Sequence, residues 1–117
     1  MFLELAHTKL DVFKVSREFT LLCYKETKNF PSAERFALTQ QLRRAALSVH
    51  LNLAEGSSRK SAGERRRFYE VSRGSLVEVD TALDIAIELD YTNKEKLQSL
   101  GVLIVKLFQM LSKMIEP

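Results

Sequence analysis

The apolar residues of this chain recur at intervals of three and four positions, which is the spacing of one face of an α-helix. The clearest stripe of this kind lies near the C-terminus. Thr92 with Glu95 three residues later has the pattern of a capping box, so a helix of roughly 24 residues, about 36 Å long, is predicted to begin there. Its apolar stripe consists of Leu97, Leu100, Ile104, Leu107, Leu111 and Met114.

A second stripe precedes this one and is rich in small residues. Ser61 with Glu64 forms another capping box, which predicts the start of the helix. Gly74 lies beside the stripe. Because glycine inside a helix costs about 1 kcal/mol relative to alanine, we expect Gly74 to allow a neighbouring helix to approach closely. The stripe consists of Phe68, Ser72, Ser75, Val79, Ala82, Ala86 and Leu89.

Two more helices are predicted in the first half of the chain. The second helix is expected to end at Gly56, because glycine is typical of the position after a helix. Its core stripe consists of Leu38, Leu42, Ala45, Val49 and either Leu53 or Asn52. The first helix is expected to end before Phe30-Pro31, since the residue before a proline disfavours the helical conformation. Its apolar positions are Val12, either Val15 or Ser16, Phe19, Leu22 and Cys23.

Four amphipathic helices, three short connections and no convincing strand predict an all-α fold. Sequential helices joined by short loops are antiparallel neighbours, so we expect an antiparallel up-down-up-down four-helix bundle. The chain has 117 residues, which is enough for one hydrophobic core but not for two. Residues 1–117 are therefore predicted to form a single four-helix-bundle domain.

The second helix carries more apolar residues than one face of a bundle helix requires. Between residues 45 and 54, seven of ten are apolar. Leu47, Leu51 and Ala54 form an additional stripe that points away from the core stripe, and in an isolated subunit it would be an exposed patch. Two interpretations are open: the bundle packs asymmetrically and covers the stripe, or the stripe is a subunit interface. We favour the interface.

Charged residues are distributed unevenly, although the formal net charge is only +3. Residues 43–73 contain eight basic and three acidic side chains. Residues 78–95, in contrast, contain six acidic side chains and one basic side chain. The third helix thus begins basic and ends acidic. Each of these charges interacts unfavourably with the helix dipole, which destabilises the helix by roughly a few tenths of a kcal/mol per charge. Head-to-tail contacts between subunits, which close into rings, would account for this pattern. A solvated charged surface is the alternative.

The sequence lacks the usual signals for catalysis, export or membrane insertion. A single cysteine, Cys23, excludes an intramolecular disulfide and fits a reducing compartment. Runs such as 102–105 are far shorter than the roughly 20 apolar residues of a membrane helix, and the N-terminus does not resemble a signal peptide. His7 and His50 have no metal-binding spacing with other ligands. We therefore expect a cytoplasmic protein that is not an enzyme and has no catalytic residues, metal or cofactor.

One long segment of the second helix, with shorter segments after it, resembles a known family. The long segment is QLRRAALSVHLNLAEG at residues 41–56, and it is followed by RKS at 59–61, RF at 67–68 and GSLVE at 74–78. This pattern is similar to that of the bacterial four-helix-bundle family first noted as products of intervening sequences within 23S ribosomal RNA genes. His50 stands where many relatives have proline.

The resemblance implies a homopentameric ring of antiparallel four-helix subunits. Most family members have no assigned activity. The best understood relatives are accessory proteins of diversity-generating retroelements, which are basic pentamers that associate with a reverse transcriptase and with nucleic acid. The implied partners are therefore further copies of the chain, RNA or DNA, and a reverse transcriptase if one is encoded nearby; no membrane partner is expected.

Two groups of residues are candidate sites. The candidate oligomer interface joins the residues selected by the family pattern to the additional apolar stripe; its members are Arg43, Arg44, Leu47, Leu51, Asn52, Glu55 and Glu78. We expect these residues to have structural or interface roles, since buried polar groups need partners and arginine binds carboxylate in a defined geometry. The candidate nucleic-acid-binding residues are Arg59, Lys60, Arg65, Arg66 and Arg67.

The basic residues between 59 and 67 have two interpretations. Guanidinium groups bind phosphates, and ring assembly would repeat the basic surface several times. Consecutive helical residues point about 100° apart, so residues 65–67 cannot all face one ligand. The alternative is a solvated helix start in which Glu70 pairs with Arg66 or Arg67. The expected function is therefore an oligomeric helical binding module with a candidate nucleic-acid surface, and the alternative is a protein-binding scaffold ring with no nucleic-acid role.

Overall fold

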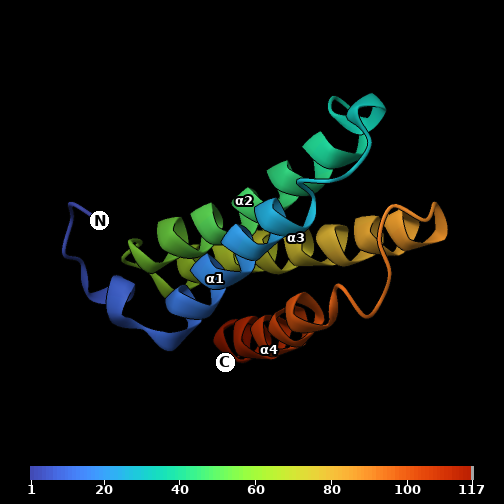
Figure 1. The fold of residues 1–117 in the computed structure, drawn as a ribbon. Helices are drawn as coiled ribbons and strands as arrows, with labels where there is room; N and C mark the ends of the chain where they lie inside the picture. The colour runs from blue at the N-terminus through green and yellow to red at the C-terminus, as the bar shows by residue number, and fades with distance from the viewer. Residues whose placement is uncertain (117) are drawn as a thin grey trace.

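The computed structural model describes residues 1–116, which contain four long helices, two short 3-10 helices and no strand. The long helices are α1 (Asp11–Glu26), α2 (Leu38–Ser57), α3 (Ala62–Glu88) and α4 (Gln98–Ile115). The short ones are η1 (Ala6–Lys9) and η2 (Ser32–Glu34). Each long helix contacts the next in chain order, and α4 returns to contact α1. The prediction of an all-α four-helix bundle is confirmed (Figure 1).

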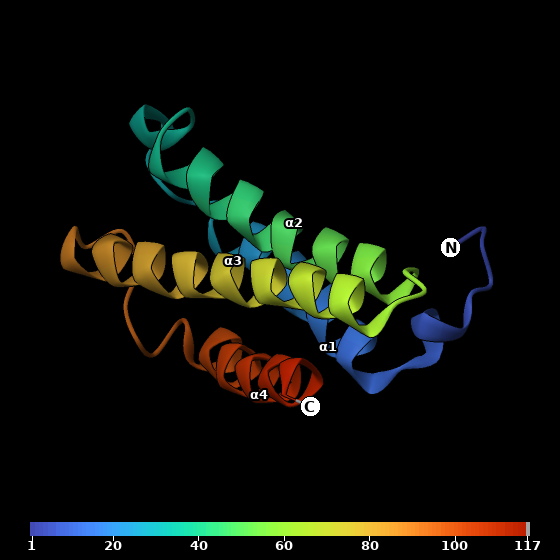
Figure 2. The same cartoon turned by 180° about the vertical axis from the view of Figure 1, so that it is seen from behind.

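The pair formed by α2 and α3 is the most extensive contact of the bundle. Gly56 explains how the two helices come so close near their connection. A Cβ atom added at Gly56 would lie 2.8 Å from the Cβ of Phe68 and 2.9 Å from the Cε1 of Tyr69, which is closer than atoms can pack. Toward the start of α2 the two helices diverge, as both views of the ribbon show (Figures 1 and 2).

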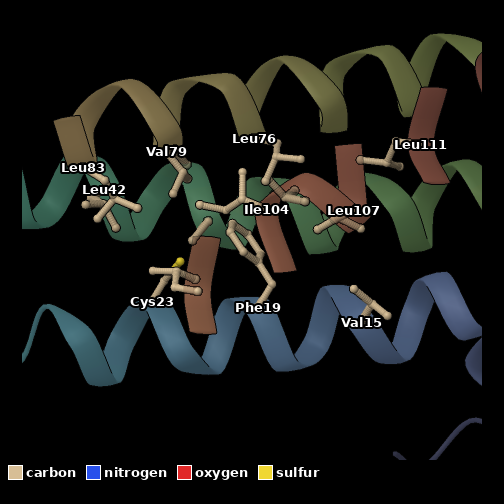
Figure 3. Packing of buried hydrophobic residues seen from close by; sticks show 14 of the residues in the cluster. Val15, Phe19, Cys23, Leu42, Leu76, Val79, Leu83, Ile104, Leu107 and Leu111 are labelled. Atoms are coloured by element: carbon tan, nitrogen blue, oxygen red, sulfur yellow. The ribbon is translucent and has the colours of Figure 1, made fainter. Parts of the chain in front are cut away.

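The hydrophobic core lies along the axis of the bundle and receives side chains from all four helices (Figure 3). The predicted stripes of α1, α2 and α4 supply most of it. The completely buried large side chains are Phe19, Leu42, Val49, Leu53, Leu76, Val79, Leu100, Leu107 and Leu111. Most polar groups inside this core have partners: Ser72 Oγ, for example, donates a hydrogen bond of 2.7 Å to the Val49 carbonyl of α2. Thr39 Oγ1 is buried without a hydrogen-bond partner among residues 1–116.

The buried face of α3 differs in part from the predicted stripe. Tyr69 and Leu83 are buried, whereas Phe68 and Ala82 are only half-buried and Leu89 is exposed. The physical reason is that α3 packs against both α2 and α4, so its buried face is wider than one row of residues. The small residues of the predicted stripe face α2, and a second row of larger side chains fills the core.

The two predicted capping boxes have different outcomes. At the start of α3 the Glu64 amide donates to Ser61 Oγ at 3.1 Å, which confirms the first. At the other site α4 begins only at Gln98, so the predicted start at Thr92 is wrong. Asn93 Oδ1 instead accepts a hydrogen bond of 2.9 Å from the Lys96 amide within a turn that precedes the helix.

The predicted roles of two glycines are also wrong. Gly56 does not follow α2 but lies inside it, since α2 continues to Ser57 and no glycine among residues 1–116 has a positive φ angle. Gly74 is exposed, and a Cβ atom added there would meet no atom within 4 Å. The close approach that was expected at Gly74 occurs at Gly56.

The C-terminal helix α4 is long and apolar enough to meet a simple criterion for a membrane-spanning helix. Uninterrupted apolar runs in the chain are short, but the whole helix reaches the required length. This is weak evidence for a membrane span, because the core helix of a water-soluble bundle meets the same criterion. One stripe of α4 is indeed buried in the core, and it consists of Leu100, Ile104, Leu107 and Leu111.

Candidate functional site

The outer face of α2 is the largest departure from an ordinary bundle helix. Leu47 and Leu51 are 40% and 56% exposed, and Ala54 is half-buried. The alternative in which one subunit covers this stripe internally is therefore wrong. Arg44 is exposed and lies one turn before Leu47, on the same outer face. We call Leu47, Leu51 and Ala54 together the α2 apolar stripe.

Arg43, although predicted as an interface residue, is engaged within the subunit. Its Nε donates to Thr27 Oγ1 at 2.9 Å, and its Nη2 donates to the Tyr24 carbonyl at 3.2 Å. The guanidinium also lies over the Tyr24 ring, 4.9 Å from its centroid. These contacts place a cation at the C-terminal end of α1, where it interacts favourably with the helix dipole. Arg43 thus holds the end of α1 against α2.

Asn52 is likewise part of a polar connection within the subunit. Its Nδ2 donates to the Ser48 carbonyl at 2.9 Å and to Ser48 Oγ at 3.0 Å, both on α2. Ser48 Oγ in turn shares a hydrogen bond of 2.9 Å with Ser75 Oγ of α3. Of the residues that the family pattern selects, Arg44 and Glu78 are exposed and have no hydrogen-bond partner for their side chains among residues 1–116.

Two of the five candidate nucleic-acid-binding residues shape the connection between α2 and α3. Arg65 Nη1 donates to the carbonyls of Arg59 and Lys60, at 3.1 and 2.7 Å. Arg59 pairs with Glu55 and lies over the Phe68 ring, 5.0 Å from its centroid. The hydrogen bonds of Arg65 satisfy carbonyl groups of the connection after α2 and fix the path of the chain into α3.

The other three cations of this connection, Lys60, Arg66 and Arg67, are exposed. Among the residues that the structure describes, the only ion pair joins Arg59 to Glu55, so the expected pairing of Glu70 with Arg66 or Arg67 is wrong. Three cations therefore stand free beside a connection that two other arginines stabilise. Guanidinium and ammonium groups are the side chains that suit phosphate, and here no ion pair within residues 1–116 occupies them.

A cluster around His50 was not found by sequence reasoning. His50 Nδ1 and Ser16 Oγ are 2.8 Å apart, and the His50 ring packs on Phe13 with 4.5 Å between centroids. Burial, followed by the positive charges of Arg17 and His7, lowers the pKa of His50. His50 is thus a half-buried contact between α1 and α2. The spacing of residues in the sequence did not predict this contact, because Ser16 and His50 are 34 residues apart.

Cys23 has the role that its apolar position indicates. Its side chain is completely buried, and burial raises the pKa of the thiol to about 12. A thiol of this kind is protonated at neutral pH and is a poor nucleophile. Among residues 1–116, no three His, Cys, Asp or Glu side chains lie close enough together to hold a metal ion.

A groove between α3 and α4 was also missed. It has a volume of about 470 Å³, and its walls include Asp80 and Asp84 of α3 and Gly101 of α4. Lys94 lies at its edge on the connection between the two helices. The spacing of Asp80 and Asp84 is common on solvated helices, so the sequence gave no reason to place a groove there. We call this feature the α3–α4 groove.

Comparison with known proteins shows which family has this pattern of residues. The family described as 23S rRNA-intervening sequence protein matches residues 8–113 of the chain. A crystal structure of a protein of unknown function from the S23 ribosomal protein family of Bacteroides thetaiotaomicron VPI-5482 has a similar fold, with a TM-score of 0.80 and 20% sequence identity. The match covers 91% of this chain and 99% of that one. No curated protein shows significant sequence similarity to the chain.

Proposed function

The chain belongs to the family of 23S rRNA-intervening sequence proteins, and from this premise we propose that it is a homopentameric ring that binds nucleic acid through the connection between α2 and α3. In this role the protein catalyses no reaction. It presents one basic surface per subunit, repeated around the ring. The observation that carries the proposal is the set of free cations Lys60, Arg66 and Arg67 beside the fixed side chains of Arg59 and Arg65.

The division between fixed and free cations supports a binding role. A loop that had to become ordered on binding would lose affinity through lost conformational entropy. Arg65 holds the backbone of this connection through two carbonyl groups, which reduces that loss. Arg66 and Arg67 point about 100° apart around the helix, so they suit contacts with successive phosphates of a strand better than contacts with one phosphate.

Assembly would strengthen binding that is weak for one subunit. Linked sites raise the effective concentration for each further contact, so a ring of basic surfaces binds a long strand far more tightly than a monomer does. The exposed α2 apolar stripe supports assembly, since a soluble protein gains by burying such a patch. The number five rests on the family resemblance.

The test is binding of fluorescent single-stranded RNA and DNA to the wild type and to a variant carrying Lys60→Gln, Arg66→Gln and Arg67→Gln. A site that neutralises about three phosphates should lose roughly 20-fold in affinity between 50 and 200 mM salt. The variant should lose most of its affinity and most of this salt dependence. Lys9→Gln, Lys14→Gln and Lys28→Gln, which remove the same charge from exposed positions elsewhere, form the matched control.

Equal binding by the variant and the control would show that the α2–α3 connection is not the binding surface. No binding of either nucleic acid in low salt, by a protein that is still oligomeric, would favour the alternative of a protein-binding scaffold ring. A reverse transcriptase gene beside this one would make that enzyme the first partner to test.

A further inference from the structure

Two surfaces with exposed apolar side chains lie on different sides of the subunit. One is the α2 apolar stripe. The other is the α3–α4 groove together with Val77 and Val105, which lie one turn beyond its walls and are 50% and 59% exposed. Figure 2 shows α3 between α2 and α4. The stripe lies on the outer face of α2, away from the core, whereas the groove lies between α3 and α4. Neither surface is covered by any other part of residues 1–116.

The groove has room for a side chain from another molecule. Gly101 lies in its wall, and a Cβ atom added there would meet no atom within 4 Å. Packing inside the subunit therefore does not require glycine at this position, although glycine in a helix costs about 1 kcal/mol. The open space beside Gly101 suits a large apolar side chain such as a leucine.

The two surfaces also carry complementary charges. Arg44 lies at one end of the α2 apolar stripe, and Asp80 and Asp84 lie in the wall of the groove. Arg44 is separated from Glu55 by eleven positions, about 16 Å along α2. Asp84 is separated from Arg73 by the same eleven positions along α3. An antiparallel alignment of the two helices therefore places Arg44 beside Asp84, and it places the Glu55–Arg59 ion pair beside Arg73.

Arg73 lies two turns before Asp80 on α3, beyond the groove, where it joins α3 to α4. Its Nη1 donates to Ser112 Oγ at 3.1 Å, and its guanidinium lies over the Phe108 ring, 5.6 Å from the centroid. Phe108 itself is 42% exposed. The exposed apolar surface thus continues from Gly101 past Val105 to Phe108, which matches the length of the stripe on α2.

We propose that the α2 apolar stripe of one subunit docks along the α3–α4 groove of a second copy, with Leu47 in the groove, Leu51 against Val77 and Val105, and Arg44 beside Asp80 and Asp84. This inference rests on the proposed homo-oligomer and specifies how it assembles. The contact joins two unlike surfaces of the same chain. Because these surfaces face different directions, each added copy is rotated relative to the one before. Contacts of this kind close into a ring when the rotation per copy divides a full turn evenly, as it does for a pentamer.

The test uses two variants that each damage one of the two surfaces. Leu51→Asp introduces a charge into the stripe, and Val105→Asp introduces one beside the groove. Each variant alone should be monomeric, because every contact in the ring uses both surfaces. Mixed together at high concentration, the variants should form a heterodimer of twice the monomer mass, since each retains the surface that the other lacks. Leu21→Asp, at an equally exposed position on α1, is the matched control and should keep the wild-type mass.

Light scattering measures the mass of each variant, and circular dichroism shows whether the variant is folded. A wild-type protein that is monomeric would contradict the proposed oligomer itself. A wild-type oligomer whose mass is unchanged by Val105→Asp, or a mixture of folded variants that stays monomeric, would overturn the docking mode alone. In a second experiment, Arg44→Asp and Asp84→Arg should each weaken assembly, and the two changes combined in one chain should restore it. Failure of this rescue would exclude the proposed alignment of Arg44 with Asp84.

Discussion

The two faces of α2 contain similar residues in opposite surroundings. On the inner face Leu42 and Leu53 are completely buried, whereas on the outer face Leu47 and Leu51 are exposed. The inner leucines stabilise the subunit through burial. The outer leucines contribute little to the subunit and are available to another molecule. The comparison shows that the apolar content of a helix reflects all of its contacts, including those outside its own chain.

The largest expected effect comes from the inner face. Leu42→Ala should lower the free energy of unfolding by about 2–5 kcal/mol, because it removes buried methyl groups and leaves a cavity in the core. Urea unfolding in a Leu51→Asp background measures this effect without a contribution from assembly. Leu47→Ala in the same background should change the free energy of unfolding by less than about 0.5 kcal/mol. Equal losses for the two leucines would contradict the distinction between the faces.

A second comparison involves two glycines whose substitution should have opposite effects. Gly56→Ala should destabilise the subunit by about 1–3 kcal/mol, since the added Cβ meets Phe68 and Tyr69 at distances too short for packing. Gly74→Ala should stabilise it by up to about 1 kcal/mol, because alanine favours the helix and the space is open. Thermal unfolding of both variants checks the prediction. Destabilisation by Gly74→Ala would show that this position is covered in the assembled protein.

The smallest effect concerns pH and the contact between α1 and α2. The pKa of His50 is lowered in the folded protein, so the unfolded chain binds a proton at higher pH than the folded one does. Stability should therefore be lost as the pH falls below the ordinary histidine value of about 6.5, and the loss should continue down to the lowered pKa. Urea midpoints measured from pH 7.5 to 5 should show this decrease. In His50→Gln the decrease should be smaller, and an identical decrease would exclude His50 as its source.

Much of the fold was predictable because it depends on local spacing. The apolar stripes of α1, α2 and α4 and the cap at Ser61 involve residues within one or two helical turns. The family was also predictable, since its pattern is a continuous string along α2. The start of α4 was not. It depends on how α3 ends: Asp90 adopts a positive φ angle, and the Tyr91 amide bonds back to the Ala86 carbonyl.

Less of the candidate site was predictable, because its geometry depends on contacts between distant residues. The sequence singled out Arg43 and the arginines after α2 but could not show that Arg43 contacts Tyr24 or that Arg65 binds backbone carbonyls. It gave no indication of the α3–α4 groove, which exists only where two helices separated by a connection come together. Spacing along one helix reveals which side chains share a face, and only the packed structure shows what that face meets.

The central claim is that the exposed face of α2 is covered by another copy of the chain. Light scattering of the wild-type protein in low and high salt tests it most directly, since the monomer has a mass of 13.4 kDa. The account predicts one species of about 67 kDa, five times the monomer mass, in both conditions, because the contact buries apolar side chains as well as charges. A mass of 13.4 kDa in both conditions would contradict it.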